Sequence, residues 1–124
     1  MSDQPEKEQL KGRTKQFALR VMRLIDALPR RRSAEVIGNQ LLRSATSVGA
    51  NYRSARRARS PAEFCAKMGI VEEEADESQY WLELIGEGGL MTTKRLQGLL
   101  DEADQIVAMV VASIRTARRG VKKR

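Results

Sequence analysis

The sequence predicts an all-α protein that folds as an antiparallel, up-down-up-down four-helix bundle. Its composition favours helices, because Ala, Glu, Lys, Leu and Arg account for 60 of the 124 residues and aromatic residues for only 4%. Apolar residues also recur three and four positions apart in four separate segments, which is the period of an amphipathic helix. Four such helices with short connections pack as a bundle, and a chain of this length forms one domain with a self-supporting core.

The first helix is expected from Leu10 to Leu28, and Pro29 ends it. The apolar face of this helix contains Phe17, Val21 and Leu24. The polar stretch that precedes it, residues 1–9, is predicted to form a flexible N-terminal arm.

The second helix is expected to follow Ser33 as N-cap and to run to about Arg57. Its apolar face consists of Ile37, Leu41, Ser44, Val48, Tyr52 and Ala55. A second line beside that face has mostly small side chains: Gly38, Leu42, Ala45 and Gly49. Small side chains let two helix axes approach closely, so this line predicts a tightly packed neighbour. The alternative is that the helix tolerates each glycine at about 1 kcal/mol relative to Ala.

The third helix has a clear start, with Ser60 as N-cap, Pro61 in the first turn and Glu63 completing a capping box. Its apolar face consists of Phe64, Met68, Val71, Ala75, Ser78, Leu82 and Ile85. The glycine-rich stretch 86–89 is typical of a helix C-terminus.

The fourth helix is expected from about Thr93 to Arg118. Its apolar face consists of Leu96, Leu100, Ala103, Val107, Val110 and Ile114. The bundle therefore spans residues 10–118, and residues 119–124 are predicted to be a frayed basic tail.

Charge is distributed unevenly along this chain, which has a net charge of +7 and no histidine. Residues 1–60 carry a balance of +9, residues 61–104 a balance of −8, and residues 105–124 a balance of +6. Blocks of this kind pair within a subunit, pair between subunits, or bind a polyanion.

Arginine dominates the basic blocks, and a guanidinium can hold a phosphate through two parallel N–H bonds. A row of such contacts gives sequence-independent affinity for a nucleic-acid backbone. The candidate nucleic-acid-binding residues are Arg30, Arg31, Arg32, Arg43, Arg53, Arg56, Arg57, Arg59, Arg118, Arg119, Lys122, Lys123 and Arg124. The alternative is that they form a solvated face or pair with the acidic run 72–77 of a neighbouring helix.

The third helix also carries large apolar side chains away from its core face, with carboxylates among them. They form a candidate oligomer interface: Ile70, Glu73, Glu77, Tyr80, Trp81 and Leu84. An exposed apolar patch of this size indicates a partner. The alternative is that this helix lies centrally in the bundle and buries two faces against its neighbours.

Polar residues Ser44, Ser47 and Asn51 border the apolar face of the second helix and form a candidate buried hydrogen-bond set that fixes helix register. Catalysis at either serine would need a neighbouring base, and histidine is absent, so no enzymatic activity is expected. Glu73 and Glu77 share a face, but di-iron bundles draw ligands from several helices and include histidine. The sequence therefore predicts neither a metal nor a cofactor.

The single cysteine, Cys65, is interpreted as a small buried hydrophobe and fits a reducing compartment. The chain has no run of 18 apolar residues, and its N-terminus is polar. We therefore expect a cytoplasmic protein with neither a membrane span nor a signal peptide.

Three stretches resemble a known family: residues 40–55 (QLLRSATSVGANYRSA), residues 63–64 with 67–78, and residues 80–82. They resemble the four-helix-bundle proteins encoded in intervening sequences of bacterial 23S rRNA genes, which are similar to the accessory variability determinant of diversity-generating retroelements. The resemblance covers about residues 15–115, and its most specific part is the Arg-Ser-Ala-x-Ser-x-x-x-Asn pattern of residues 43–51.

This resemblance implies a cytoplasmic homo-oligomer, a pentameric ring of bundles, with no established enzymatic activity. In the retroelement branch the ring is basic, binds nucleic acid and docks on a reverse transcriptase, so such a partner is implied here by analogy alone. The residues and the resemblance together predict a non-catalytic oligomer that binds RNA or DNA backbones through the second helix and the tail. The alternative is a protein-interaction scaffold whose charge blocks pair between subunits.

Overall fold

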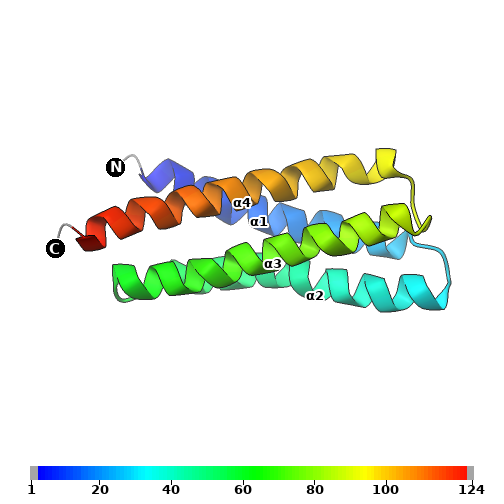
Figure 1. Ribbon diagram of the computed structural model, residues 1–124, viewed down its shortest axis with the longest axis horizontal. Helices are drawn as coiled ribbons and strands as arrows, with labels where there is room; N and C mark the ends of the chain where they lie inside the picture. The colour runs from blue at the N-terminus through cyan, green and yellow to red at the C-terminus, as the bar shows by residue number, and fades with distance from the viewer. Residues whose placement is uncertain (1–2, 123–124) are drawn as a thin grey trace.

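Four long helices make up the fold in a computed structural model, which describes the backbone of residues 3–122 and the side chains of residues 8–120. They are α1 (Asp3–Asp26), α2 (Arg32–Ala55), α3 (Pro61–Glu87) and α4 (Thr93–Lys122), and there is no strand among the described residues. Each helix runs opposite to the one before it (Figure 1). The predicted all-α, up-down-up-down bundle is therefore confirmed.

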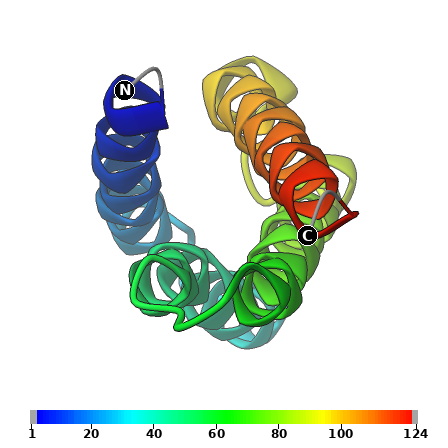
Figure 2. The same ribbon diagram turned by 90° about the vertical axis from the view of Figure 1, so that its left-hand side faces the viewer.

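The helices follow one another around the bundle in chain order: α2 packs on α1 and α3, and α4 packs on α3. Viewed from one end, they lie along an arc whose two ends are α1 and α4 (Figure 2). The contact between α1 and α4 is the slightest of the four, and over residues 3–122 no Cα atom of α1 lies within 8 Å of one in α3. These two helices therefore stand diagonally in the bundle, and their outer faces point away from each other.

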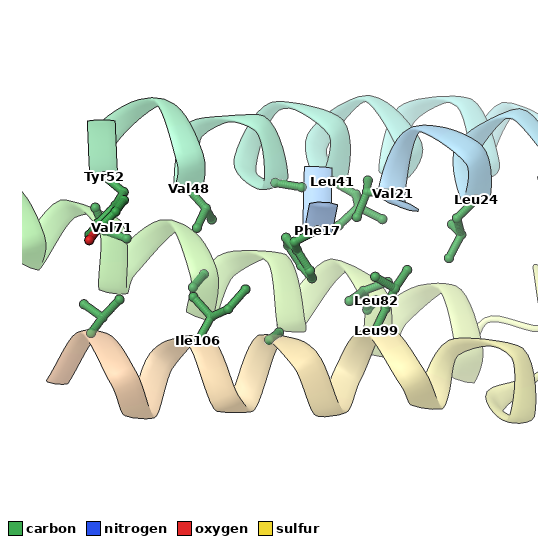
Figure 3. Packing of buried hydrophobic residues seen from close by; sticks show 14 of the residues in the cluster. Phe17, Val21, Leu24, Leu41, Val48, Tyr52, Val71, Leu82, Leu99 and Ile106 are labelled. Carbon is green, nitrogen blue, oxygen red and sulfur yellow. The ribbon is translucent and has the colours of Figure 1, made fainter. Parts of the chain in front are cut away.

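One continuous cluster of apolar side chains from all four helices forms the core (Figure 3). Phe17, Val48 and Val71 are at most 1% exposed within it. Every residue of the faces predicted for α2 and α3 is buried or packs against this cluster. The spacing of apolar residues thus located the core correctly on these two helices.

On α4 the buried face is turned slightly from the predicted one. Leu99 and Ile106 are buried, whereas the expected Leu100 and Val107 are only partly buried. Leu99 lies three residues before Glu102, and Ile106 lies four residues after it. Both therefore lie on the same side of α4 as Glu102, whose side chain contacts Arg13 of α1. The face is turned because α4 packs on α1 as well as on α3.

The line of small residues on α2 lies against α1. A Cβ atom on Gly38 would lie 3.3 Å from Leu28 Cδ1, and one on Gly49 would lie 3.4 Å from Thr14 Oγ1. The buried Thr14 hydroxyl is occupied within its own helix, because it donates to the Leu10 carbonyl oxygen at 2.8 Å. The predicted close neighbour on this side of α2 is therefore confirmed.

Helix α1 begins earlier than expected, so the stretch that was predicted as a flexible arm is helical from Asp3 onward. Pro5 fits the first turn, where backbone N–H groups have no partner within the helix. Glu8 also pairs with Arg56 of α2 at 3.3 Å, which ties this end of α1 to the bundle.

Two other helix ends also differ from the predicted ones. The N-cap of α2 is Arg31 rather than Ser33, because the extended Arg31 backbone places its carbonyl to accept from the Glu35 N–H at 3.0 Å. Helix α4 continues to Lys122, so the expected tail is helical over its described part; no proline follows Thr93 to stop it.

The predicted N-cap and first turn of α3 are confirmed, whereas the Glu63 carboxylate, which was expected to complete a capping box, pairs with Arg59 and Lys67. The Ser60 side chain accepts a hydrogen bond from the Glu63 backbone N–H at 3.1 Å, and Pro61 occupies the first turn. The helix ends at Glu87 with Gly88 as its C-cap, and Gly89 follows with a φ of +74°, a left-handed conformation that favours glycine.

A side-chain bridge links the two ends of the arc. Arg13 donates from Nε and Nη2 to the two carboxylate oxygens of Glu102, at 2.8 and 2.6 Å. Its Nη2 also lies 2.6 Å from Gln105 Oε1. The hydrogen bond to Glu102 raises the pKa of Arg13, which keeps the guanidinium charged.

Candidate nucleic-acid interface and oligomer surface

The candidate nucleic-acid-binding residues fall mainly into two groups at opposite ends of the bundle. Arg30 to Arg32 lie where α2 begins, and Arg53 and Arg57 lie where it ends. A helix rises about 1.5 Å per residue, so the 24 residues of α2 separate these groups by about 36 Å. The first group lies at the right-hand end in Figure 1 and the second at the left-hand end, where α4 also ends. The structure therefore does not gather all the candidates on one surface.

The end of the bundle where α2 and α4 terminate carries five exposed arginines, which we call the arginine end: Arg53, Arg57, Arg115, Arg118 and Arg119. Within residues 8–120, none of them forms an ion pair. Arg115 was missed in the sequence analysis. It lies within the helix predicted to end at about Arg118, one helical turn before that residue.

Three other candidates are held by carboxylates of the same chain. The ion pairs are Arg43 with Glu74 (3.6 Å) and Glu77, Arg56 with Glu8 (3.3 Å), and Arg59 with Glu63 (3.7 Å). Exposed pairs of this kind contribute at most about 1 kcal/mol, so they reduce the positive charge rather than fix the fold. The side chains of the last three candidates lie outside the described residues: Lys122, Lys123 and Arg124.

The turn between α1 and α2 forms a shallow hollow at the opposite end of the bundle. Arg30, Arg31 and Arg32 line it together with Glu35 and with apolar side chains from the end of α1. All three arginines are exposed. The Glu35 carboxylate offsets part of their charge, so this hollow is less basic than the number of its arginines suggests.

The outer face of α3 carries the predicted oligomer surface. Ile70 and Tyr80 are 43% and 53% exposed, Glu73 is exposed and Leu84 is half-buried. We call these four residues, with the exposed Glu83 beside them, the α3 outer face. Within residues 8–120, Ile70 and Tyr80 therefore leave large apolar side chains exposed on this face.

Two of the predicted interface residues lie at the edge of this face, toward α2. Trp81 is half-buried and packs against the core, with its ring in edge-to-face contact with Tyr80 at 5.1 Å between centroids. Its Nε1 donates to Glu77 at 3.3 Å, and Glu77 also accepts from Arg43. Helix α3 therefore buries a second face in part, as the alternative interpretation proposed, and still leaves apolar area exposed.

Glu74 lies beneath this network. Burial raises its pKa, and the neighbouring Glu77 raises it further, while Arg43 lowers it. Its Oε1 atom is buried and has no hydrogen-bond partner among the described residues, although Arg43 Nη1 lies 3.6 Å away. The carboxylate is thus a mild source of strain in the contact between α2 and α3.

The three polar residues predicted to form a buried hydrogen-bond set, Ser44, Ser47 and Asn51, do not all bond to another helix. Ser44 is buried and accepts a hydrogen bond from Ser78 of α3 at 2.9 Å. The Asn51 side chain instead donates to the Ser47 carbonyl oxygen of its own helix, at 2.8 Å. Only Ser44 contributes to a hydrogen bond between side chains of two helices.

The remaining chemistry-bearing groups form no recognisable centre in the described part of the chain. Cys65 is half-buried, with its Sγ 3.8 Å from the Ile114 carbonyl oxygen. Among the side chains of residues 8–120 there is no cluster of three or more Cys, Asp or Glu suited to a metal ion. None of the described helices is both long enough and apolar enough to cross a membrane.

These features define an all-α four-helix-bundle protein with an arginine-rich end and an acidic, partly apolar outer face. The chain belongs to the 23S rRNA-intervening sequence protein family, whose model matches residues 6–112. That match confirms the resemblance of the three sequence stretches and extends it to the first turns of α1.

A solved relative supports the same conclusion. A crystal structure of a protein of unknown function from the S23 ribosomal protein family of Bacteroides thetaiotaomicron VPI-5482 shares 32% sequence identity with this chain. The alignment covers 89% of this chain and 98% of that one, with a TM-score of 0.83. No curated protein matches this chain significantly.

Proposed function

We propose that this chain is a non-catalytic, oligomeric bundle protein that binds RNA or DNA backbones through its arginine end. The observation that supports this function is the concentration of five exposed arginines, none paired within residues 8–120, where α2 and α4 end. A pentameric ring, implied by the family resemblance, would present several such ends to one polymer.

The chemistry of the arginine end suits phosphate rather than bases. Each guanidinium can donate two parallel hydrogen bonds to a phosphate, and each contact releases a counterion. Such binding is independent of sequence and weakens steeply with salt. A simpler explanation is that arginines near helix C-termini interact favourably with the helix dipole and stabilise the helix by about 0.3–1 kcal/mol each. If the arginines act only on the helix dipole, their removal should change the stability of the protein, and the protein should have no affinity for phosphate. Measuring stability and binding therefore separates the two explanations.

The test compares two variants by fluorescence anisotropy with labelled single-stranded RNA, duplex RNA and duplex DNA. One variant carries Arg57→Gln and Arg118→Gln; the matched control carries Lys94→Gln and Arg95→Gln, whose native side chains are exposed at the opposite end of the bundle and form no ion pair among residues 8–120. We expect the first to bind weakly and to lose about 0.9 from the slope of log K against log salt for each duplex phosphate contact removed. The control should bind like the wild type. No binding by the wild type at low salt would rule out this function.

A second function, a protein-interaction scaffold, is favoured by the α3 outer face. In that case the wild type would oligomerise but would not bind nucleic acid. Tyr80→Glu is the suitable probe, because Tyr80 is 53% exposed. Trp81 packs against the core, so Trp81→Glu would also destabilise the fold. An unchanged mass of Tyr80→Glu in light scattering would rule out the scaffold.

A further inference from the structure

The α3 outer face needs an occupant with apolar side chains and positive charge. Ile70 and Tyr80 are its exposed apolar residues. Helix α3 as a whole carries eight acidic side chains and one basic side chain, Lys67. Like charges repel, so a second α3 is a poor partner for this face.

The outer face of α1 has the complementary character. Met22 is 47% exposed and Leu19, one turn earlier, is half-buried. Lys15 and Arg23 flank them, both exposed, and neither forms an ion pair among the described residues. We call these four residues the α1 outer face. It combines an apolar centre with basic flanks.

We propose that the α3 outer face of one copy of this chain binds the α1 outer face of a second copy, with the two bundles parallel and in the same register. The proposal rests on the oligomeric part of the proposed function and adds which surfaces meet. It also gives the charged surfaces different roles. The acidic face of α3 pairs with the basic face of α1, and the arginine end stays free to bind nucleic acid.

The heights of the residues along the bundle support this pairing. Thr14 lies against Gly49, so in antiparallel helices Leu19 is level with Ser44 of α2. Ser44 in turn bonds to Ser78 of α3. Leu19 and Met22 are therefore level with residues 78–81 of α3, where Tyr80 is exposed.

The charged flanks match in the same register. Counting along the helices from the same contacts places Lys15 level with residues 73–74 and Arg23 level with residues 82–83. Glu73 and Glu83 are exposed at those levels. A second copy displaced sideways, without a shift along the bundle axis, would thus bring Tyr80 against Leu19 and Met22, and basic side chains against acidic ones.

This contact joins two different surfaces, and its geometry determines the type of assembly. α1 and α3 stand diagonally, so each copy offers one face to the copy before it and the other face to the copy after it. Head-to-tail contacts of this kind form rings or filaments. Because no axial shift is needed, the copies lie side by side with their axes parallel, and all the arginine ends then lie on one side of the assembly.

The test uses two variants that each remove one face: Met22→Glu on α1 and Tyr80→Glu on α3. We expect each variant alone to be monomeric by light scattering, because every copy lacks one of the two faces. An equimolar mixture should form a 1:1 dimer and nothing larger, since one intact face of each kind remains. Ala112→Glu, at an exposed position of α4, is the matched control and should keep the wild-type mass.

Other outcomes would overturn the proposal. An oligomeric Met22→Glu, with Tyr80→Glu monomeric, would mean that two α3 faces meet. A monomeric wild type would exclude any contact between copies. Binding of labelled RNA, measured on the same samples, tests the proposed function separately. If the two variants are monomeric and the wild type binds no RNA, the proposed contact between copies is supported and nucleic-acid binding is refuted.

A charge exchange tests the register. Lys15→Glu and Glu73→Lys should each weaken the assembly, seen as a dissociation constant raised at least tenfold. The double variant should recover most of the loss, because the pair is restored with reversed signs. Failure of the double variant to recover, with circular dichroism showing all three folded, would overturn the proposed alignment.

Discussion

The contact between α2 and α3 and the contact between α1 and α4 enclose the same core in different ways. The first is extensive, contains the buried hydrogen bond between Ser44 and Ser78, and is flanked by the ion pairs of Arg43. The second is slight and depends on the bridge between Arg13 and Glu102. We infer that the α2–α3 hairpin is the most stable part of the bundle and that α1 and α4 separate first in local opening.

The largest test compares the same truncation on α3, within the α2–α3 hairpin, and on α4. Leu82 of α3 is 0% exposed and Leu99 of α4 is 5% exposed, and both belong to the core cluster (Figure 3). Leu→Ala at a buried site costs about 2–5 kcal/mol, and the cost is larger where the surroundings cannot relax. Leu82→Ala should therefore lie near the top of this range and Leu99→Ala near the bottom. Urea unfolding of both variants measures the difference; an equal or reversed order would contradict the comparison.

A smaller effect is expected from removing the bridge itself. Arg13→Ala should lower the free energy of unfolding by about 1 kcal/mol, because the pair is bidentate but partly exposed to solvent. Arg95→Ala, at an exposed position without an ion pair among residues 8–120, should have almost no effect. Hydrogen exchange would sharpen the comparison: amides of α1 and α4 should exchange faster in Arg13→Ala, while those of α2 and α3 should not change.

Ser44→Ala is expected to cost still less, about 0.5–1 kcal/mol. The Ser78 hydroxyl would lose one partner but keep the Glu74 carbonyl oxygen, which lies 2.9 Å from it. No buried hydroxyl is thus left without a partner, which is why the loss is small. Thermal unfolding is sufficient for this measurement, and a loss above about 2 kcal/mol would show that the bond between the helices has a larger role.

Periodicity predicted the fold well because each helix has one dominant apolar face, and Ser60 with Pro61 marks the start of α3 in the sequence itself. It was less accurate on α4, where contact with α1 turns the buried face toward Leu99 and Ile106. Residue spacing along one helix contains no information about how far a neighbouring helix rotates it.

The candidate site was harder to predict, since it depends on positions in three dimensions. In the sequence, Arg30, Arg43 and Arg53 form one group because all three belong to the basic block of residues 1–60. In the fold, Arg30 and Arg53 lie at opposite ends of α2, and Arg43 between them is ion-paired with α3. Helix length and carboxylate partners, neither of which a charge count includes, separate these residues.

The smallest expected effect concerns Glu74, and it is visible mainly in the pH dependence of stability. Burial, with a contribution from Glu77, raises the pKa of this carboxyl in the folded state, and Arg43 only partly opposes that change. The folded protein therefore binds the proton more tightly than the unfolded chain does. The stabilisation from the neutral form is complete below the unfolded pKa and is lost as the pH rises through the raised folded pKa.

Glu74→Gln removes this titration, so its free energy of unfolding should fall less than that of the wild type as the pH rises from about 4 to neutrality. Near neutral pH the variant should be at least as stable as the wild type, because the amide avoids the cost of a buried charge. Urea unfolding across this range measures both effects. A variant that becomes progressively less stable than the wild type toward neutral pH would show the opposite balance, in which the attraction of Arg43 for the Glu74 carboxylate outweighs burial.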